Sequence, residues 1–324
     1  MSTTANRTRF HPLLPMVRSV VAHKDCHDGL AAAMMVRAVM PEIPVRFVQY
    51  NTREHEELSA DPGLLFVDFS PPKARAVEFL RAESLVLDHH PSARVMLQPF
   101  VEAGLCVFAD NAVEPGVSGA VLAFKHVFER LSESSFRYQR NLARIARLAG
   151  IYDTWQRTSA DWAAAAALRE ALLFWTPERW LDEVTQGSDF DSLLAVGPEL
   201  VAKIQRDALR AIARGCLEIL PDGRRVLFVE GTHVKNDAPD LALGVDLVLA
   251  FRFEAAPDEK LIVSARSRAV DGREGFDCEA LAVSRNGGGH RNAAGFSIPL
   301  ARSSPQPYEL LRALLADYLS GGEP

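Results

Sequence analysis

Two short stretches of the sequence place imidazole and carboxylate groups directly after apolar runs. One run leads into Asp88, His89 and His90, and another leads into the segment from His23 to Asp28. Nitrogen and oxygen donors of this kind are the ligands that hard and borderline divalent metals bind in proteins. The sequence therefore indicates a metal site.

A third carboxylate strengthens this interpretation. Asp68 follows the apolar run Leu64–Val67 directly, which predicts a carboxylate at the end of a buried strand. A buried carboxylate is costly unless a positive group compensates it. Further carboxylates expected at the same edge would repel one another strongly, and two divalent metal ions would relieve the repulsion; these are Asp25, Asp28, Asp88 and Asp153.

The three residues of the Asp88-His89-His90 triplet can have different roles. Side chains alternate along an extended backbone, so one histidine can bind metal while its neighbour faces a substrate. Asp88 can orient an imidazole through the ring nitrogen that is not used for binding.

The elements that must position these residues are alternating strands and helices. Helical spacing is found over Gly29–Met40 and Pro71–Arg81. Short apolar runs between and around them predict strands over Val17–Ala22, Val45–Val48, Leu64–Val67, Ser84–Leu87 and Cys106–Ala109. This alternation is typical of a doubly wound, mostly parallel α/β sheet, in which ligands bind at the carboxyl ends of the strands.

From Ser118 onward the pattern changes to helices, with Ser118 as the expected N-cap. The predicted helices cover Ser118–Leu131, Phe136–Ala149, Trp162–Phe174 and Pro198–Leu220. A smaller α/β domain follows, with strands over Arg225–Val229, Asp246–Phe253 and Leu261–Arg266 and a closing helix over Tyr308–Tyr318. We expect a first domain over 1–190, a linker helix over 191–222 and a second domain over 223–324, with a cleft between the two domains.

Composition limits the partners. The 324 residues carry a formal net charge of −6, which argues against a broad basic face for long duplex nucleic acid but permits a small anionic substrate. The four cysteines are scattered without a C-x-x-C pair, which is typical of a reduced, cytoplasmic protein. No apolar run is long enough to cross a bilayer, so we expect no membrane association. The oligomeric state stays open, a homodimer included.

The motifs together resemble the DHH-family phosphoesterases with a DHH-associated C-terminal domain, a group that includes oligoribonucleases, cyclic-dinucleotide phosphodiesterases and nucleotide phosphatases. The resemblance covers nearly the whole chain. It rests on motifs in the family's order: His23–Gly29, Val67-Asp68-Phe69, Asp88-His89-His90, Ile151–Trp155, Val263–Ser267 and Gly287–Gly295.

The resemblance implies two divalent metal ions, usually Mn²⁺, with Mg²⁺ or Co²⁺ as alternatives. One metal would take His23 and Asp25, and the other Asp28, His89 and Asp153, with Asp68 as the bridge. His90 would act beside the substrate phosphate, with Asp88 as its partner.

In the second domain, the resemblance implies a substrate-binding surface. Its residues would be Arg266, Ser267, Gly288, Gly289 and His290. Glycines let backbone amides approach an anion closely, and an arginine can bind phosphate with two parallel hydrogen bonds.

The first motif departs from the family pattern. The family commonly has a histidine followed by two aspartates in alternate positions, whereas this chain has His23-Lys24-Asp25-Cys26-His27-Asp28. Asp28 matches well, and either Asp25 or His27 could complete the first metal site. Cys26 and His27 are otherwise expected to pack the loop.

The resemblance favours a metal-dependent phosphodiesterase acting on short oligonucleotides or dinucleotides. A nucleotide monophosphatase of the adenosine bisphosphate type is one alternative, and a nucleotide-binding regulator without hydrolysis is another. A dinucleotide-dependent oxidoreductase ranks far behind, because no G-x-G-x-x-G follows the first strand.

Overall fold

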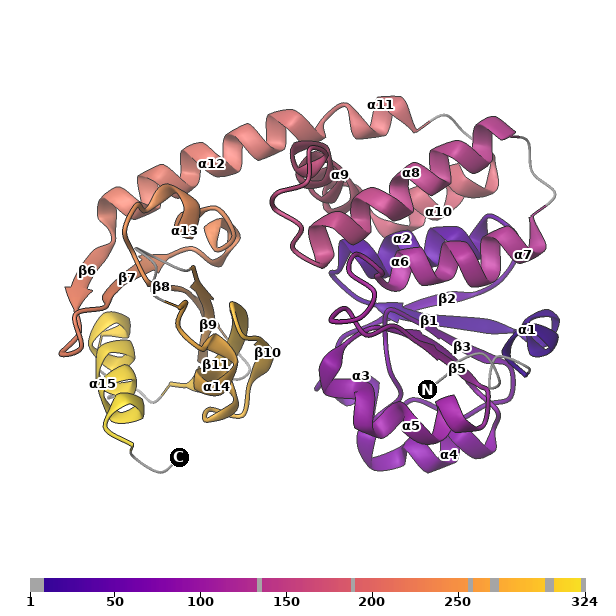
Figure 1. Ribbon diagram of the computed structural model, residues 1–324, viewed down its shortest axis with the longest axis horizontal. Helices are drawn as coiled ribbons and strands as arrows, with labels where there is room; N and C mark the ends of the chain where they lie inside the picture. Colours follow the sequence, from indigo (N-terminus) through magenta and orange to yellow (C-terminus); the bar gives the residue numbers. More distant parts are fainter. Residues whose placement is uncertain are drawn as a thin grey trace. The chain divides into compact units, whose positions relative to one another are not determined.

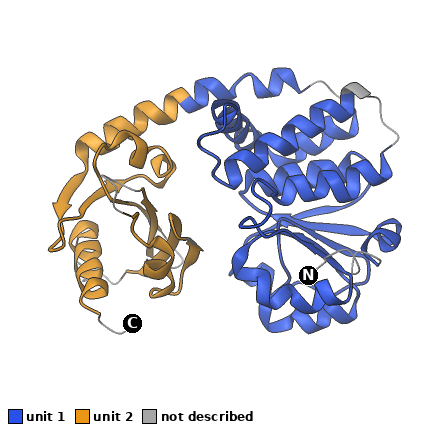
Figure 2. Ribbon diagram, viewed as in Figure 1, with its two compact units in different colours: residues 1–201 blue, residues 202–324 orange. Residues whose placement is uncertain are grey.

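The computed structural model describes residues 9–132, 136–187, 190–255, 259–268, 274–300 and 306–321. The chain divides into two compact units, residues 1–201 and 202–324 (Figure 2). No described helix is long and apolar enough to span a membrane.

The first unit is built on a five-stranded parallel sheet with the order β2-β1-β3-β4-β5. Its strands are β1 (Ser19–His23), β2 (Val45–Val48), β3 (Leu64–Val67), β4 (Leu85–Asp88) and β5 (Cys106–Phe108). All four residues of β3 and of β4 are buried, as expected for strands covered on both faces. The predicted parallel α/β sheet is confirmed.

Helices cover both faces of this sheet (Figure 1). One face carries α2 (His27–Arg37), α6 (Gly119–Ala123), α8 (Phe136–Asp153) and α10 (Pro177–Thr185). The other carries α3 (Arg53–Glu56), α4 (Ala76–Arg81) and α5 (Arg94–Glu102). The remaining helices of the unit are α1 (Phe10–Leu13), α7 (Glu129–Leu131), α9 (Trp162–Phe174) and α11 (Asp191–Leu194).

The segment predicted as one helix over Ser118–Leu131 is helical but not uniform. Five π-helical residues, Phe124–Phe128, separate α6 from α7. Ser118 is the N-cap residue of α6, as predicted, but its side chain makes no capping hydrogen bond. Its hydroxyl instead donates to Asp28 Oδ1 at 2.6 Å.

The second unit has a mixed six-stranded sheet with the order β10-β11-β9-β8-β7-β6, in which β7 and β8 are parallel and the other neighbours antiparallel. Its strands are β6 (Cys216–Ile219), β7 (Arg225–Glu230), β8 (Leu247–Glu254), β9 (Lys260–Ser267), β10 (Gly288–His290) and β11 (Ala293–Pro299). Its helices are α13 (Ala238–Leu241), α14 (Cys278–Val283) and α15 (Pro307–Leu319). Helices α14 and α15 bury one face of the sheet.

One predicted helix ends early. The sequence predicts a helix over Pro198–Leu220, but α12 spans Gly197–Arg214 and β6 begins at Cys216. Residues 216–219 pair with β7 across the turn at Asp222-Gly223, which makes a hairpin. Asp-Gly is a common hairpin turn, and the pairing it permits outweighs the helical pattern of the preceding residues.

Candidate metal centre

The predicted site residues of the first unit lie at the carboxyl edge of its sheet. His23 ends β1, Asp68 follows β3, and Asp88 ends β4. Strands β1 and β3 are neighbours, with β2 on the far side of β1, so the strand order reverses there. Such a switch point is where ligands bind in open parallel sheets.

Asp68 lies at the centre of the cluster, and its two oxygens face different groups. Asp68 Oδ2 is 3.5 Å from His23 Nδ1 and 3.4 Å from Cys26 Sγ. Asp68 Oδ1 is 3.1 Å from His89 Nε2. The backbone of Asp68 is left-handed, with φ of 52°, so the strand's direction changes at the residue that carries the carboxylate.

His89 joins Asp68 to two further carboxylates. His89 Nε2 lies 3.2 Å from Asp153 Oδ2 and 3.9 Å from Asp28 Oδ2. The imidazole is buried, and burial alone would lower its pKa, but the hydrogen bond to Asp68 and the charge of Asp153 raise the pKa of His89 to about 9. Without a metal, a protonated imidazole therefore supplies the positive charge that these carboxylates require.

Asp28 is fully buried in the first turn of α2. Its carboxylate accepts the Ser118 hydroxyl and the Ala120 backbone N–H at the start of α6. Burial and the nearby charges of Asp68 and Asp153 raise the pKa of Asp28 well above its usual value. The pKa of Asp68 is instead held well below its usual value, because the neighbouring imidazoles of His23 and His89 outweigh the effect of burial.

Asp88 does not belong to this set of donors but orients the histidine pair. Asp88 Oδ1 accepts the backbone N–H groups of His89 and His90 at 2.7 and 3.1 Å and lies 2.7 Å from His90 Nδ1. Asp88 Oδ2 accepts the Ser70 hydroxyl. Burial would lower the pKa of His90, but Asp88 raises it to about 9, which leaves its Nε2 as a charged donor.

The segment before α2 does not follow the prediction. Asp25 is exposed, with a left-handed φ of 56°, and belongs to none of the groups of potential metal ligands among the described residues. Cys26 instead turns inward to Asp68. Burial, followed by the charges of Asp68 and Asp153, raises the pKa of the Cys26 thiol well above its usual value.

The donor set fits divalent metal ions. Three groups of side chains each offer donor atoms within 4.8 Å of one another: His23 with Asp68 and His90, Cys26 with His27 and Asp153, and Asp28 with Asp68 and His89. His23 Nδ1 is buried and has no hydrogen-bond partner in the described part of the chain. A buried lone pair beside a carboxylate is an arrangement that a cation would satisfy.

Asn111 and Ser70 are site residues that the sequence analysis missed. Asn111 Nδ2 lies 3.0 Å from His89 Nδ1, and Asn111 stands just after β5 at the same edge of the sheet. The rule that located Asp68, a polar residue directly after an apolar run, would have found Asp110, and Asn111 is the next residue along the chain.

In the second unit, the sheet register groups the predicted substrate residues. Arg266 on β9 and His290 on β10 both pair with Ala293 on β11. Arg266 Nη1 donates to the carbonyls of Ala265 and Ala294 at 2.8 and 3.2 Å, and Nε donates to Asn236 Oδ1 at 3.0 Å. Its guanidinium is therefore held in place by the sheet.

The other predicted residues of this unit have structural partners. Ser267 is buried and donates its hydroxyl to the Phe276 carbonyl at 2.7 Å. A Cβ at Gly288 would meet nothing within 4 Å, whereas a Cβ at Gly289 would lie 2.6 Å from the Ala293 carbonyl oxygen. Gly288 thus leaves its backbone open to an approaching group, and Gly289 is required by the β10–β11 hairpin itself.

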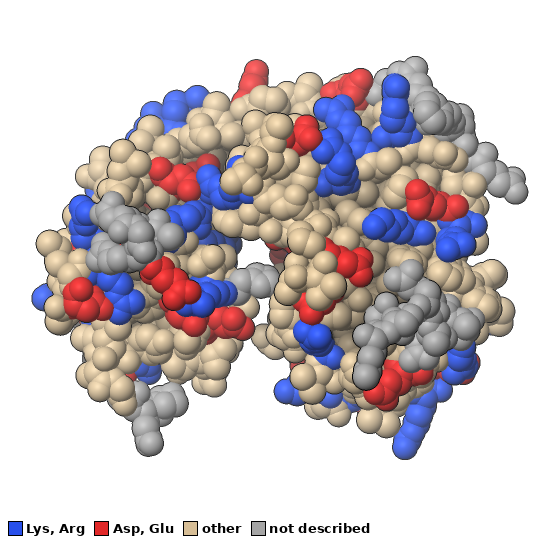
Figure 3. All heavy atoms as spheres, viewed as in Figure 1, with Lys and Arg blue, Asp and Glu red and all other residues tan. Residues whose placement is uncertain are grey.

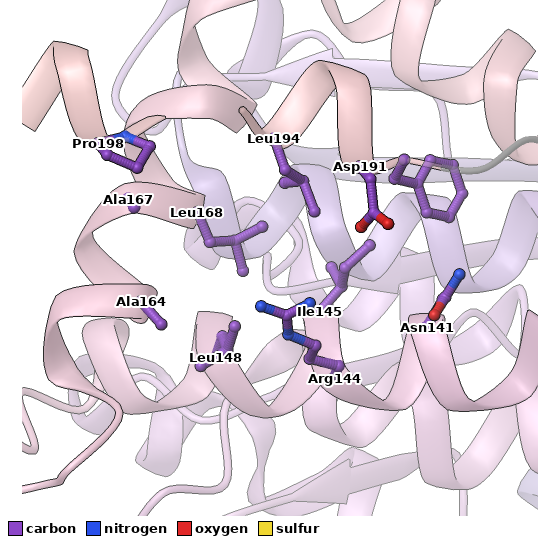
Figure 4. A pocket seen from close by; sticks show the side chains of 11 residues that line it. Asn141, Arg144, Ile145, Leu148, Ala164, Ala167, Leu168, Asp191, Leu194 and Pro198 are labelled. Carbon is purple, nitrogen blue, oxygen red and sulfur yellow. The ribbon is translucent and has the colours of Figure 1, made fainter. Parts of the chain in front are cut away.

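The described residues also form a pocket away from the candidate metal centre. A pocket of about 200 Å³ in the first unit lies among α8, α9, α11 and the start of α12 (Figure 4), and none of the predicted site residues lines it. On the face shown in Figure 3, basic and acidic side chains are interspersed.

No protein-family model matches the sequence, and no curated protein sequence is significantly similar to it. The fold is nevertheless found in solved structures. A pGpG-specific phosphodiesterase, PggH, from Vibrio cholerae has a TM-score of 0.53 and 13% identity, covering 92% of this chain and 99% of that chain. A DHH-domain protein described as a member of the s1p family of ribosomal proteins has a TM-score of 0.58 and 16% identity, covering 98% and 90%.

A third match is RecJ from Thermus thermophilus, solved in complex with Mn²⁺, with a TM-score of 0.54 and 18% identity. The match covers 98% of this chain and 55% of RecJ. At these identities the comparisons establish the fold: both units of the chain follow an architecture found in DHH-domain proteins.

Proposed function

We propose that the chain is a DHH-family phosphoesterase that hydrolyses phosphodiester bonds in short oligonucleotides or dinucleotides with two divalent metal ions. The observation that carries the proposal is the geometry of Asp68. One of its oxygens faces His23 and the other faces His89. A carboxylate that presents each oxygen to a separate set of donors is suited to bridge two cations.

The residues assigned to the two metal positions follow from these contacts. His89, Asp153 and Asp28 would hold one metal with Asp68 Oδ1. His23 would hold the other with Asp68 Oδ2. When bound, a metal pair lowers the pKa of a water molecule and stabilises the attacking and leaving oxygens of an in-line displacement at phosphorus.

The chain's own residues supply the remaining functions. His90, fixed by Asp88, donates from Nε2 to a phosphate oxygen and stabilises its negative charge in the transition state. Asp88 acts through His90 and is a positioning residue. Arg266, Gly288 and His290 of the second unit bind the phosphate or base of the substrate.

The proposal also names the metal ion and the substrate. Oxygen and imidazole donors dominate the cluster, which suits Mn²⁺, with Mg²⁺ and Co²⁺ as alternatives. A dinucleotide is favoured because PggH, which shares the fold over nearly its whole length, is a phosphodiesterase specific for pGpG. The four cysteines are free, which supports a reducing, cytoplasmic location.

The test is hydrolysis of pGpG, short RNA, cyclic dinucleotides, adenosine bisphosphate and polyphosphate by purified protein with Mn²⁺. We expect turnover of a dinucleotide and its loss in Asp68→Ala and His89→Ala. The matched controls are Asp61→Ala and His233→Ala, which alter exposed residues. Turnover that survives in both site variants would rule out the centre. If adenosine bisphosphate releases phosphate and no other substrate of the panel is hydrolysed, the chain is a monophosphatase and not a phosphodiesterase.

A further inference from the structure

Cys26 occupies a place in the cluster where the sequence pattern leads one to expect a carboxylate. In the motif that the chain resembles, two aspartates stand in alternate positions, and the residue in the alternate position to Asp28 is Cys26. Cys26 Sγ lies 3.4 Å from Asp68 Oδ2, the same oxygen that faces His23 Nδ1. The thiol thus stands beside the bridging carboxylate, on the His23 side.

Asp25 and His27, the two residues predicted to complete the first metal site, lie in different environments. Asp25 is exposed and belongs to none of the groups of potential metal ligands among the described residues. His27 is buried, and its Nε2 lies 3.4 Å from the Ala149 carbonyl. Since a carbonyl can only accept a hydrogen bond, Nε2 carries the proton and Nδ1 keeps its lone pair.

Cys26, His27 and Asp153 form a further group of donors, which shares Asp153 with the metal position at His89. Each offers one atom, and the three atoms lie within 4.8 Å of one another. Sulfur, imidazole nitrogen and carboxylate oxygen together form a donor set that prefers Zn²⁺, Co²⁺ or Fe²⁺ over Mg²⁺. His23 Nδ1, buried and without a hydrogen-bond partner among the described residues, belongs to the neighbouring group with Asp68 and His90 and faces the same oxygen of Asp68 as Cys26 Sγ does.

We propose that Cys26 is a thiolate ligand of the metal centre, and that its sulfur gives one metal position a preference for Zn²⁺ or Co²⁺ over Mg²⁺. Formation of the sulfur–metal bond releases the thiol proton to solvent, and no electron is transferred. The inference rests on the metal centre of the proposed function but assigns it a ligand and a selectivity that the carboxylates and imidazoles alone would not provide.

The experiment is a titration of the full-length, metal-free protein with Co²⁺, followed by ultraviolet absorption. A thiolate bound to Co²⁺ gives a sulfur-to-metal charge-transfer band, which oxygen and nitrogen ligands do not give. We expect the band in the wild-type protein and its loss in Cys26→Ser. The matched control is Cys106→Ser, which alters a buried thiol on β5 and leaves the band in place.

A second variant, Cys26→Asp, keeps the test valid if Cys26→Ser does not fold. It supplies the carboxylate of the family motif. This variant should bind Co²⁺ without the band, and calorimetry should show that its ratio of Zn²⁺ affinity to Mg²⁺ affinity is lower than that of the wild type. The inference is overturned if Co²⁺ binds without the band, if the band persists in Cys26→Ser, or if Co²⁺ does not bind at all.

The two proposals fail in different ways. A charge-transfer band without hydrolysis of any substrate in the panel would support Cys26 as a metal ligand and contradict the proposed phosphodiesterase activity. Hydrolysis with Co²⁺ but without the band would support the proposed enzymatic activity and contradict the proposal that Cys26 is a thiolate ligand.

Discussion

Asn111 Nδ2 lies 3.0 Å from His89 Nδ1, on the side of the imidazole ring opposite the Nε2 atom that faces Asp68. Asn111 Oδ1 is buried and has no hydrogen-bond partner in the described part of the chain. A half-turn of the amide exchanges the two atoms, so that Oδ1 accepts a proton from His89 Nδ1. The amide then fixes the tautomer in which Nε2 carries a lone pair for a metal.

Asn111→Ala should therefore weaken metal binding. We expect a loss of roughly 10- to 100-fold in Mn²⁺ affinity, the range found when a hydrogen bond behind a ligating histidine is removed. Asn111→Asp keeps an oxygen for Nδ1–H and should restore much of the affinity. Calorimetric titration with Mn²⁺ measures both, and Asn141→Ala, which alters an asparagine at the separate pocket, is the control. Equal losses in the two Asn111 variants would contradict a role in fixing the tautomer.

Gly119, the first residue of α6, lies close to the side chains of Asp68 and Asp28. A Cβ on Gly119 would lie 2.4 Å from Asp68 Cβ and 2.9 Å from Asp28 Oδ2. Both neighbours are buried, so Gly119→Ala must displace a carboxylate at an expected cost of about 1–3 kcal/mol in stability. We expect Mn²⁺ binding to be lost while the protein stays folded, as measured by calorimetry and thermal denaturation. Gly288→Ala, where a Cβ meets nothing within 4 Å, should leave Mn²⁺ affinity unchanged.

The positions of Asp68 and His89 could be predicted from sequence because both follow strands whose apolar runs are continuous. Parallel strands that are adjacent in a sheet bring such positions together without further information. Asn111 could not be found in this way, because Asp110 is the polar residue directly after the apolar run, and the amide of Asn111 becomes informative only when His89 is seen beside it.

The loop before α2 could not be predicted in this way. Whether Asp25 or Cys26 turns inward depends on the backbone conformation, and the left-handed φ of Asp25 turns its carboxylate to solvent. Ser118 stands at the N-cap of α6 as predicted, but its hydroxyl donates to Asp28, ninety residues away in the sequence, and not to the helix. Contacts of this range arise from tertiary packing and leave no local pattern.

Arg266 gives a prediction for substrate binding. Its guanidinium is held by hydrogen bonds to the carbonyls of Ala265 and Ala294, and a charged hydrogen bond to phosphate contributes about 1.5–3 kcal/mol. Arg266→Ala should raise KM for a dinucleotide by roughly 10- to 100-fold with a smaller effect on kcat, because it removes binding that precedes the chemical step. Steady-state kinetics measures the two constants. Arg252→Ala, on an exposed arginine of β8, should change neither. A fall in kcat alone would place Arg266 in the chemical step.

His55 supports the loop that carries Asp68 and gives a prediction for pH. His55 Nε2 donates to the Ser70 carbonyl at 3.1 Å, and its ring packs against Phe69 with 4.9 Å between ring centroids. Burial lowers the pKa of His55 below its usual value. The unfolded chain, in which histidine titrates near about 6.5, therefore binds this proton first as the pH falls. The stability that His55 contributes is fully present above that pH and is lost as the pH falls toward the folded pKa.

His55→Gln keeps a side-chain amide that can donate to Ser70 but cannot take up a proton in this range. We expect the free energy of unfolding of the wild type to fall more steeply between about pH 7 and about pH 5 than that of the variant. Urea denaturation at a series of pH values measures the difference, and His233→Gln, at an exposed histidine, should parallel the wild type. Parallel curves for His55→Gln and the wild type would mean that protonation of His55 does not destabilise the loop. A steeper fall in the wild type would mean that acid loosens the support of Asp68 through Ser70, because the imidazole that donates to the Ser70 carbonyl packs on Phe69, the residue next to Asp68.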